Sequence, residues 1–150
     1  MRGLEPKRPA KKFAGGARLR TATVSRQAPR ILIIEDELLI ALMIEEMVRE
    51  SGYRVSGVAH TIGMAGQEFA KRNYDVVLLD INIGGRFYAE TADRLVKDGI
   101  PFAFVTGYDY LVDPRHEQIP IIQKPFVAAH LRAVLETLVG PGTLTRADGL

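Results

Sequence analysis

The sequence predicts an α/β protein built on one parallel sheet with helices on both faces. Three observations predict this doubly wound fold: short apolar runs alternate with segments of helical periodicity, four of the runs stop at a polar residue, and glycines or prolines separate the segments. Strands that alternate with helices form parallel sheets through right-handed crossovers. With 150 residues, the chain has room for one such domain.

The first unit begins with the apolar run 31–34, which ends at three acids, residues 35–37. A helix is expected over 38–50, where apolar residues recur at helical spacing opposite the charged residues. Ser51-Gly52 follows it, which is a usual ending for a helix. The apolar face of this helix is formed by Leu39, Ile40, Leu42, Met43, Ile44, Met47 and Val48.

The second and third units each pair a short strand with a helix. Residues 54–59 form the second expected strand, and 62–72 the helix after it. The run 76–79 is too short for a helix and unbroken by polar residues, so it indicates a strand buried on both faces. It stops at Asp80, and a short helix is expected over 89–98. The inward side chains of that helix are Ala92, Leu95 and Val96.

The fourth and fifth strands also stop at polar residues. The fourth is expected over 101–105 and ends at Thr106. Residues 108–116 have little periodicity and contain a proline, which predicts a short or irregular helix. The fifth strand is expected over 119–123 and ends at Lys124.

The last helix is expected over 127–139, where Gly140-Pro141-Gly142 stops it and leaves a frayed end. We therefore divide the chain into a basic N-terminal arm (1–29), one folded domain (30–140) and a C-terminal tail (141–150). The chain contains no cysteine, which fits a reducing compartment such as the cytoplasm. No apolar run approaches the roughly 20 residues of a membrane span, so no membrane partner is expected.

The charge of the chain is unevenly distributed. Residues 1–30 contain nine Lys or Arg and one acid, whereas 31–150 contain eleven Lys or Arg and seventeen acids. The arm also lacks sustained periodicity, which predicts disorder. We favour a solvated tail over a nucleic-acid or anionic-surface site, and a native start near Val24 is a third reading. DNA binding by the arm would show a steep salt dependence that is lost on deletion of 1–28.

The polar residues at the strand ends predict a common site. The carboxyl ends of parallel strands meet at one edge of the sheet, where open α/β folds bind their ligands. Three carboxylates crowded there would repel one another and raise their pKa values, and a divalent cation removes that repulsion. Oxygen ligands without His or Cys suit Mg²⁺. The residues brought together are Glu35, Asp36, Asp80, Thr106 and Lys124.

Such a site suits phosphoryl transfer. A carboxylate can accept a phosphoryl group as an aspartyl phosphate. Mg²⁺, the Lys124 ammonium and the Thr106 hydroxyl would each neutralise or bind an oxygen of that group.

The ordered motifs resemble the receiver domain of bacterial two-component response regulators. The resemblance rests on ILIIEDE at 31–37, VVLLDIN at 76–82, VTG at 105–107 and QKPF at 123–126. It implies the flavodoxin-like strand order 2-1-3-4-5, and a single-domain response regulator that signals through an unknown downstream protein as a monomer or weak dimer. A receiver would take its phosphoryl group from a sensor histidine kinase. It would catalyse its own phosphorylation and dephosphorylation, and it would not act as a conventional multiple-turnover enzyme.

The same resemblance assigns roles to individual residues. Asp80 would be the phosphoacceptor, and Thr106 and Lys124 would bind the phosphoryl oxygens. The Mg²⁺ ligands would be Asp36, Glu35 through water, Asp80 and the backbone carbonyl of Asn82; the Lys124–Pro125 bond is expected to be cis.

One segment of the sequence resembles a particular subclass of receiver domains. PFAFVTGY at 101–108 is similar to the "FAT GUY" receivers, which are often paired with histidine kinases of the HWE type. Many receivers carry an aromatic switch residue three positions before the lysine, but here that residue is Ile121. We therefore expect residues 107–117 to carry the signal. Tyr108 in that segment is interpreted either as a packing residue or as a partner contact.

Two other classes of function compete with a phosphorylated receiver. An aspartyl-nucleophile phosphatase would need Asp-x-Asp after the first strand, but here the acids at that place are Glu35-Asp36, and position 82, two after Asp80, is Asn. A binding module that keeps only the fold would not need the full acid set. The three histidines have no ligand spacing, so we interpret them as structural or solvent-facing: His60, His116 and His130.

Overall fold

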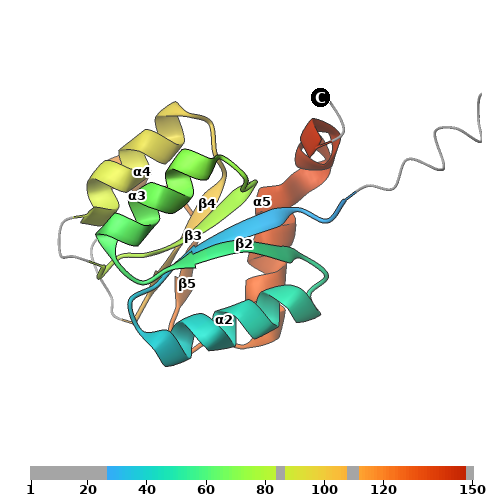
Figure 1. The fold of residues 1–150 in the computed structure, drawn as a ribbon, viewed down its shortest axis with the longest axis horizontal. Helices are drawn as coiled ribbons and strands as arrows, with labels where there is room; N and C mark the ends of the chain where they lie inside the picture. Colours follow the sequence, from blue (N-terminus) through green and yellow to red (C-terminus); the bar gives the residue numbers. More distant parts are fainter. Residues whose placement is uncertain (1–26, 84–86, 108–111, 148–150) are drawn as a thin grey trace, which may run out of the picture.

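The computed structural model describes residues 27–83, 87–107 and 112–147, and it contains a five-stranded parallel sheet (Figure 1). The strand order is β2-β1-β3-β4-β5, as the resemblance implied. The strands are β1 (Arg30–Ile34), β2 (Arg54–Ala59), β3 (Val76–Asp80), β4 (Phe102–Thr106) and β5 (Ile121–Gln123). The helices are α2 (Leu38–Glu50), α3 (Ile62–Lys71), α4 (Phe87–Lys97), the 3-10 turn η2 (Pro114–His116) and α5 (Ala128–Ala147).

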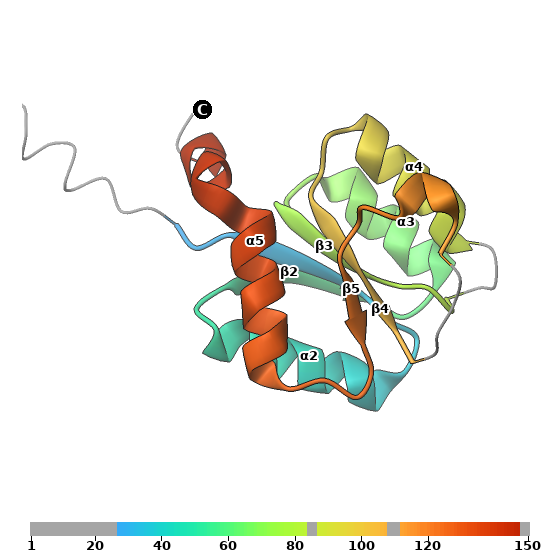
Figure 2. The same cartoon turned by 180° about the vertical axis from the view of Figure 1, so that it is seen from behind.

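Helices cover both faces of the sheet, with α3 and α4 on one side and α2 and α5 on the other (Figures 1 and 2). Successive residues of β1 serve the two cores in turn. Ile31 and Ile33 pack toward α2 and α5, and Leu32 and Ile34 pack toward α3 and α4. Every residue of β3 is buried, which confirms the prediction of a strand covered on both faces.

The apolar face predicted for the first helix is wider than the face that the fold buries. Ile44 and Val48 of α2 are buried, but Leu39 is 80% exposed and Leu42 is 51% exposed. A helix packed on a sheet buries a limited stripe, and the predicted apolar residues span a broader arc than that. Val96 of α4 was also expected to face inward and is instead 55% exposed.

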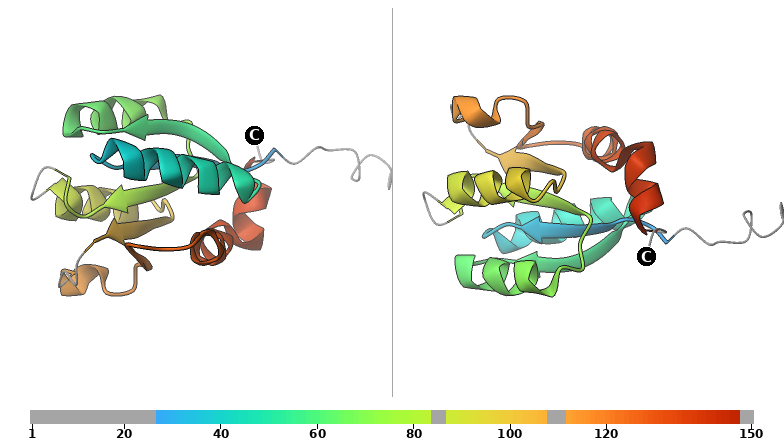
Figure 3. Two further views of the ribbon diagram at one scale, coloured as in Figure 1. Left: turned by 90° about the horizontal axis from the view of Figure 1, so that it is seen from below. Right: turned by 90° about the horizontal axis from the view of Figure 1, so that it is seen from above.

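The last helix breaks where the sequence predicts but does not fray there. Gly140 has φ 49° and ψ 169°, a left-handed conformation that glycine adopts without steric cost. Helical structure then resumes and continues to Ala147. Proline is well tolerated in a first helical turn, which explains how Pro141 can begin the second segment. Figure 3 shows these last turns at an angle to the rest of α5.

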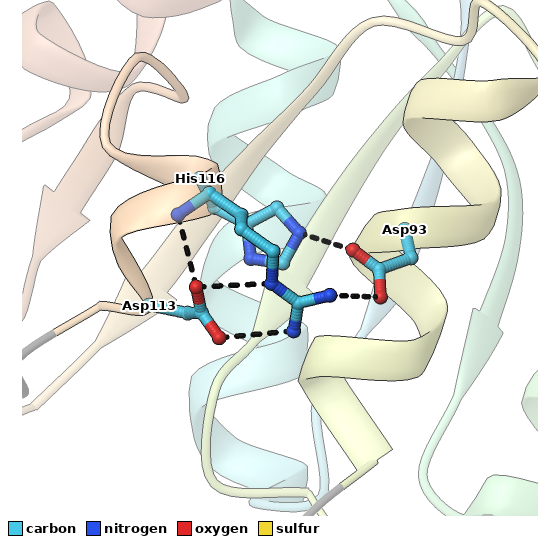
Figure 4. Close-up of polar contacts among 4 residues, drawn as sticks. Asp93, Asp113 and His116 are labelled. Atoms are coloured by element: carbon cyan, nitrogen blue, oxygen red, sulfur yellow. Dashed lines mark hydrogen bonds and ion pairs between the residues drawn. The ribbon is translucent and has the colours of Figure 1, made fainter.

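A network of ion pairs fastens the connection between β4 and β5 to helix α4 (Figure 4). One oxygen of Asp93 lies 2.8 Å from Nε2 of His116, and the other accepts from Arg115 Nη1 at 3.0 Å. Because a carboxylate only accepts, Nε2 of His116 carries the proton. Asp113 also pairs with Arg115 and caps η2. We call this network the Asp93 clasp; it secures the described part of the connection that leads from Thr106 to Lys124.

The burial of each partner predicts how the Asp93 clasp contributes to stability. His116 is buried and Arg115 is exposed. Asp93→Ala leaves the His116 donor without its acceptor, so we expect the free energy of unfolding to fall by roughly 1–3 kcal/mol. Arg115→Ala should cost much less, because solvent screens an exposed pair. Urea unfolding measures both, with Asp93→Asn as the control that keeps an acceptor for His116. Equal losses for the Asp93→Ala and Arg115→Ala variants would contradict this account.

No helix within the described part of the chain combines the length and apolar character needed to cross a membrane.

Candidate functional site

Three carboxylates meet at the carboxyl ends of β1 and β3, which are adjacent parallel strands. Glu35 and Asp36 follow β1 directly, and Asp80 is the last residue of β3. One oxygen atom from each lies within 4.8 Å of the others. Glu35 and Asp80 are each 1% exposed, whereas Asp36 is exposed. The structure therefore brings the three predicted acids together, two of them beneath the surface and one at it.

Lys124 supplies a positive charge to this acidic cluster. Its Nζ lies 2.8 Å from Oε2 of Glu35 and 3.7 Å from Oδ2 of Asp80. The Lys124 side chain is only 12% exposed, so these contacts are largely shielded from water. Its backbone N–H donates to the Thr106 carbonyl at 2.7 Å, which joins the ends of β4 and β5. The following Lys124–Pro125 peptide bond is cis, the isomer that the resemblance to receiver domains implied.

The Asp80 carboxylate is held on one side only. Its Oδ1 accepts a hydrogen bond from the Asn82 backbone N–H at 2.9 Å. Its Oδ2 is buried, and among the described residues it has no hydrogen-bond donor; the Lys124 ammonium is nearby. A fixed carboxylate with one uncommitted oxygen is suited to bind a cation or to attack an electrophile. The metal-ligand role predicted for the Asn82 carbonyl stays a prediction.

Burial and mutual repulsion determine the ionisation of the cluster. Desolvation raises the pKa of Glu35 to about 7; its hydrogen bond with Lys124 opposes this rise and the neighbouring Asp80 adds to it. Desolvation also raises the pKa of Asp80, although the Asn82 N–H opposes it. Burial alone would lower the pKa of Lys124, but the adjacent acids outweigh burial and raise it. The site therefore favours an additional positive charge.

The side chains present fit a magnesium ion. The cluster offers only oxygen ligands, which Mg²⁺ prefers, and one or two carboxylates are its usual protein share. Among the described residues, Lys124 is the cation that pairs with Glu35 and Asp80, so the three carboxylates of the cluster carry more negative charge than it balances. Asp36 and Asp80, with Glu35 behind them, are the residues that would hold the ion.

The remaining predicted residues lie around this rim or outside the described residues. Thr106 is buried at the end of β4, opposite Gln123 in the pairing of β4 with β5. Ile121 begins β5 and is 41% exposed. Tyr108 and residues 1–26 of the basic arm lie outside the described residues.

Sequence reasoning missed one contact of the site. We interpreted His60 as structural or solvent-facing, but its Nδ1 lies 2.9 Å from the Glu35 backbone oxygen. His60 directly follows β2, the neighbour of β1 in the sheet. The position of this histidine after a strand was the one available signal, because the pairing of β2 with β1 brings the two strand ends together.

The fold and the rim of acids with one lysine define a class: a flavodoxin-like α/β protein with a cluster of three acids that could hold a cation, beside a largely shielded ammonium. The family model of the response regulator receiver domain matches residues 31–136. This chain belongs to that family.

The similar proteins agree with this assignment. The curated phyllosphere-induced regulator PhyR of Methylorubrum extorquens is 35% identical over 113 residues, which are 72% of this chain and 42% of that protein. The PhyR receiver domain of Erythrobacter litoralis has a TM-score of 0.67 and 31% identity, and the match covers 75% of this chain and 91% of that one.

A third similar structure is the BeF3-activated conformation of SdrG from Pseudomonas melonis Fr1. It has a TM-score of 0.62 and 34% identity, and the match covers 73% of this chain and 97% of that one. This chain thus matches isolated receiver domains over nearly their full length, but less than half of the curated PhyR.

Proposed function

We propose that this receiver domain accepts a phosphoryl group on Asp80 from a phosphohistidine of a sensor histidine kinase, in a Mg²⁺-dependent reaction in the cytoplasm. The observation that carries the proposal is the state of the Asp80 carboxylate. One of its oxygens is fixed by the Asn82 N–H, and the other is buried, with no donor among the described residues, beside Lys124 and two further acids. This arrangement leaves one carboxylate oxygen available to attack phosphorus.

The proposed transfer forms one bond and breaks one. An Asp80 oxygen attacks the phosphorus atom, the phosphorus–nitrogen bond of the donor breaks, and the histidine nitrogen keeps the electron pair of that bond. The product is an acyl phosphate, whose oxygens Lys124 and Thr106 would bind. Bound Mg²⁺ would supply charge neutralisation for the oxygens of the phosphoryl group. Hydrolysis of the acyl phosphate by water would return the free carboxylate.

The surface around the site supports a protein as the donor. The exposed residues Leu38, Leu39 and Leu42 begin the helix that follows the acidic loop. Val127, which follows the lysine loop, is 67% exposed. Exposed apolar side chains that follow both the acidic loop and the lysine loop suit contact with another macromolecule. We assign this surface to the kinase, and the FAT GUY resemblance suggests a kinase of the HWE type.

The proposed output is contact with a downstream protein, made by a monomer or weak dimer. Ile121 occupies the position where many receivers have an aromatic switch, so we assign the readout to residues 107–117 instead. A similar protein, SdrG, is described in a BeF3-activated conformation, which supports an activated conformation of this receiver domain.

Phosphoryl labelling tests the proposal directly. The purified protein is incubated with a radiolabelled small-molecule acyl phosphate, or with labelled candidate kinases, with Mg²⁺ or with excess EDTA. We expect Mg²⁺-dependent label that hydroxylamine removes, because acyl phosphates react with that nucleophile and phosphate esters do not. Absence of label from every donor at millimolar Mg²⁺ would favour the binding module that keeps only the fold.

A further inference from the structure

We propose that His60 is a positioning residue for the metal site: it fixes the peptide that carries Asp36, and so sets the Mg²⁺ affinity. This inference rests on the proposed function, because it assigns a cation to the acidic cluster. It concerns a residue outside the cluster that follows β2, whereas the acids lie at the ends of β1 and β3.

The geometry of the contact defines its chemistry. Nδ1 of His60 lies 2.9 Å from the backbone oxygen of Glu35. A carbonyl oxygen only accepts hydrogen bonds, so Nδ1 carries a proton and donates it. The Glu35 N–H in turn donates to the Ala59 carbonyl at 2.9 Å. Ala59, the last residue of β2, and His60, which follows it, therefore hold the peptide units on both sides of Glu35.

The effect of His60 falls on Asp36 because of its place in the chain. The carbonyl of Glu35 belongs to the peptide unit whose nitrogen is that of Asp36, so fixing this oxygen fixes the plane from which the Asp36 side chain leaves the backbone. The carboxylates of Glu35 and Asp80 are buried and held by Lys124 and by the Asn82 N–H. Asp36 is exposed, so its position depends more on its backbone.

A purely structural role for His60 would instead predict that loss of its ring lowers the thermal stability of the protein. His60 is half-buried, and water can replace its hydrogen bond when the ring is removed. Loss of the ring should therefore change thermal stability little. A weaker metal site in a protein of unchanged stability is the signature of positioning, since groups that orient metal ligands typically contribute 10–100-fold to metal affinity.

Two replacements that are nearly isosteric with each other separate the donor from the ring. In His60→Asn, the amide nitrogen is two bonds from Cβ, as Nδ1 is, so the donor is retained. The side chain introduced by His60→Leu has nearly the shape of the asparagine in His60→Asn, but it has no hydrogen-bond donor. Isothermal calorimetry of the full chain with MgCl₂ gives the affinities, and thermal unfolding without metal gives the stabilities.

We expect Mg²⁺ binding about tenfold weaker in the His60→Leu variant and near the wild-type value in the His60→Asn variant. Labelling by the small acyl phosphate should need more Mg²⁺ for half-maximal rate in the His60→Leu variant, with an unchanged rate at saturation. Equal affinities of the wild-type and His60→Leu proteins would overturn the role of His60, as would equal weakening in both variants. A wild-type protein that binds no Mg²⁺ would instead reject the proposed function itself.

Discussion

Replacement of Asp80 by asparagine is expected to reduce phosphoryl labelling to background. The amide has nearly the shape of the carboxylate and can still accept from the Asn82 N–H, so the loop after β3 is preserved. It carries no charge and is a poor nucleophile, so no acyl phosphate forms. Labelling with the small acyl phosphate at saturating Mg²⁺ measures this loss.

The matched control for this variant lies at the other end of the same strand. Asp75 precedes β3 and is fixed by hydrogen bonds from Arg30, which hold the pKa of its carboxyl low despite partial burial. Asp75→Asn changes the same functional group far from the acidic rim, so labelling should persist. Labelling that survived in the Asp80→Asn variant would show that another residue accepts the phosphoryl group.

The stability of the Asp80→Asn variant shows whether its loss of labelling comes from the missing nucleophile or from unfolding of the protein. The pKa of Asp80 is raised in the folded protein, which means that the fold disfavours its ionised form. At neutral pH, asparagine removes that penalty and relieves repulsion with Glu35, while Lys124 keeps its 2.8 Å contact with Glu35. The thermal midpoint should therefore be equal to that of the wild type or higher.

The sequence could predict that the site residues lie close together, because the carboxyl ends of parallel strands meet at one edge of the sheet. Strand ends at Asp80, Thr106 and Lys124 follow from where apolar runs stop, which local sequence shows directly. Predicting which residues surround Asp80 required no knowledge of long-range contacts beyond the rule that parallel strand ends share one edge. The strand order itself came from the resemblance of the motifs, since alternation alone does not fix it.

The contacts that escaped prediction depend on how distant elements pack. Asp93 and His116 are 23 residues apart, and no periodicity connects a helix surface to a 3-10 turn after another strand. The exposure of Leu39 depends on the angle at which α2 lies on the sheet, which an apolar pattern does not specify. The contact of His60 with Glu35 depends on the register of β2 against β1.

Replacement of Lys124 by methionine is expected to destabilise the protein as well as weaken phosphorylation. Methionine matches the length of the lysine stem but removes the cation beside two carboxylates that are each 1% exposed. Removing one partner of a buried ion pair costs roughly 3–5 kcal/mol, because the other charge stays buried without compensation. Urea unfolding at about pH 8 measures this loss.

The loss should shrink as the pH falls. Glu35 has a pKa of about 7 in the folded protein against an ordinary 4.5, so between these values the folded state binds more protons and its stability falls as the pH rises. Without Lys124 the pKa of Glu35 rises further. At about pH 5, Glu35 is protonated in both folded proteins, so the difference in unfolding free energy between them should be small. A loss that is equal at both pH values would exclude Glu35 as the uncompensated charge.

Two further variants test the cause of this destabilisation. Lys71→Met removes an ion pair with the same 2.8 Å separation, Lys71 to Glu68, but that lysine is 57% exposed. Solvent screening should limit its cost to under about 1 kcal/mol. Adding Glu35→Gln to Lys124→Met should recover much of the lost stability, because the uncompensated carboxylate is gone. A double variant no more stable than the Lys124→Met protein would place the cost in lost packing of the lysine stem and not in the buried charge.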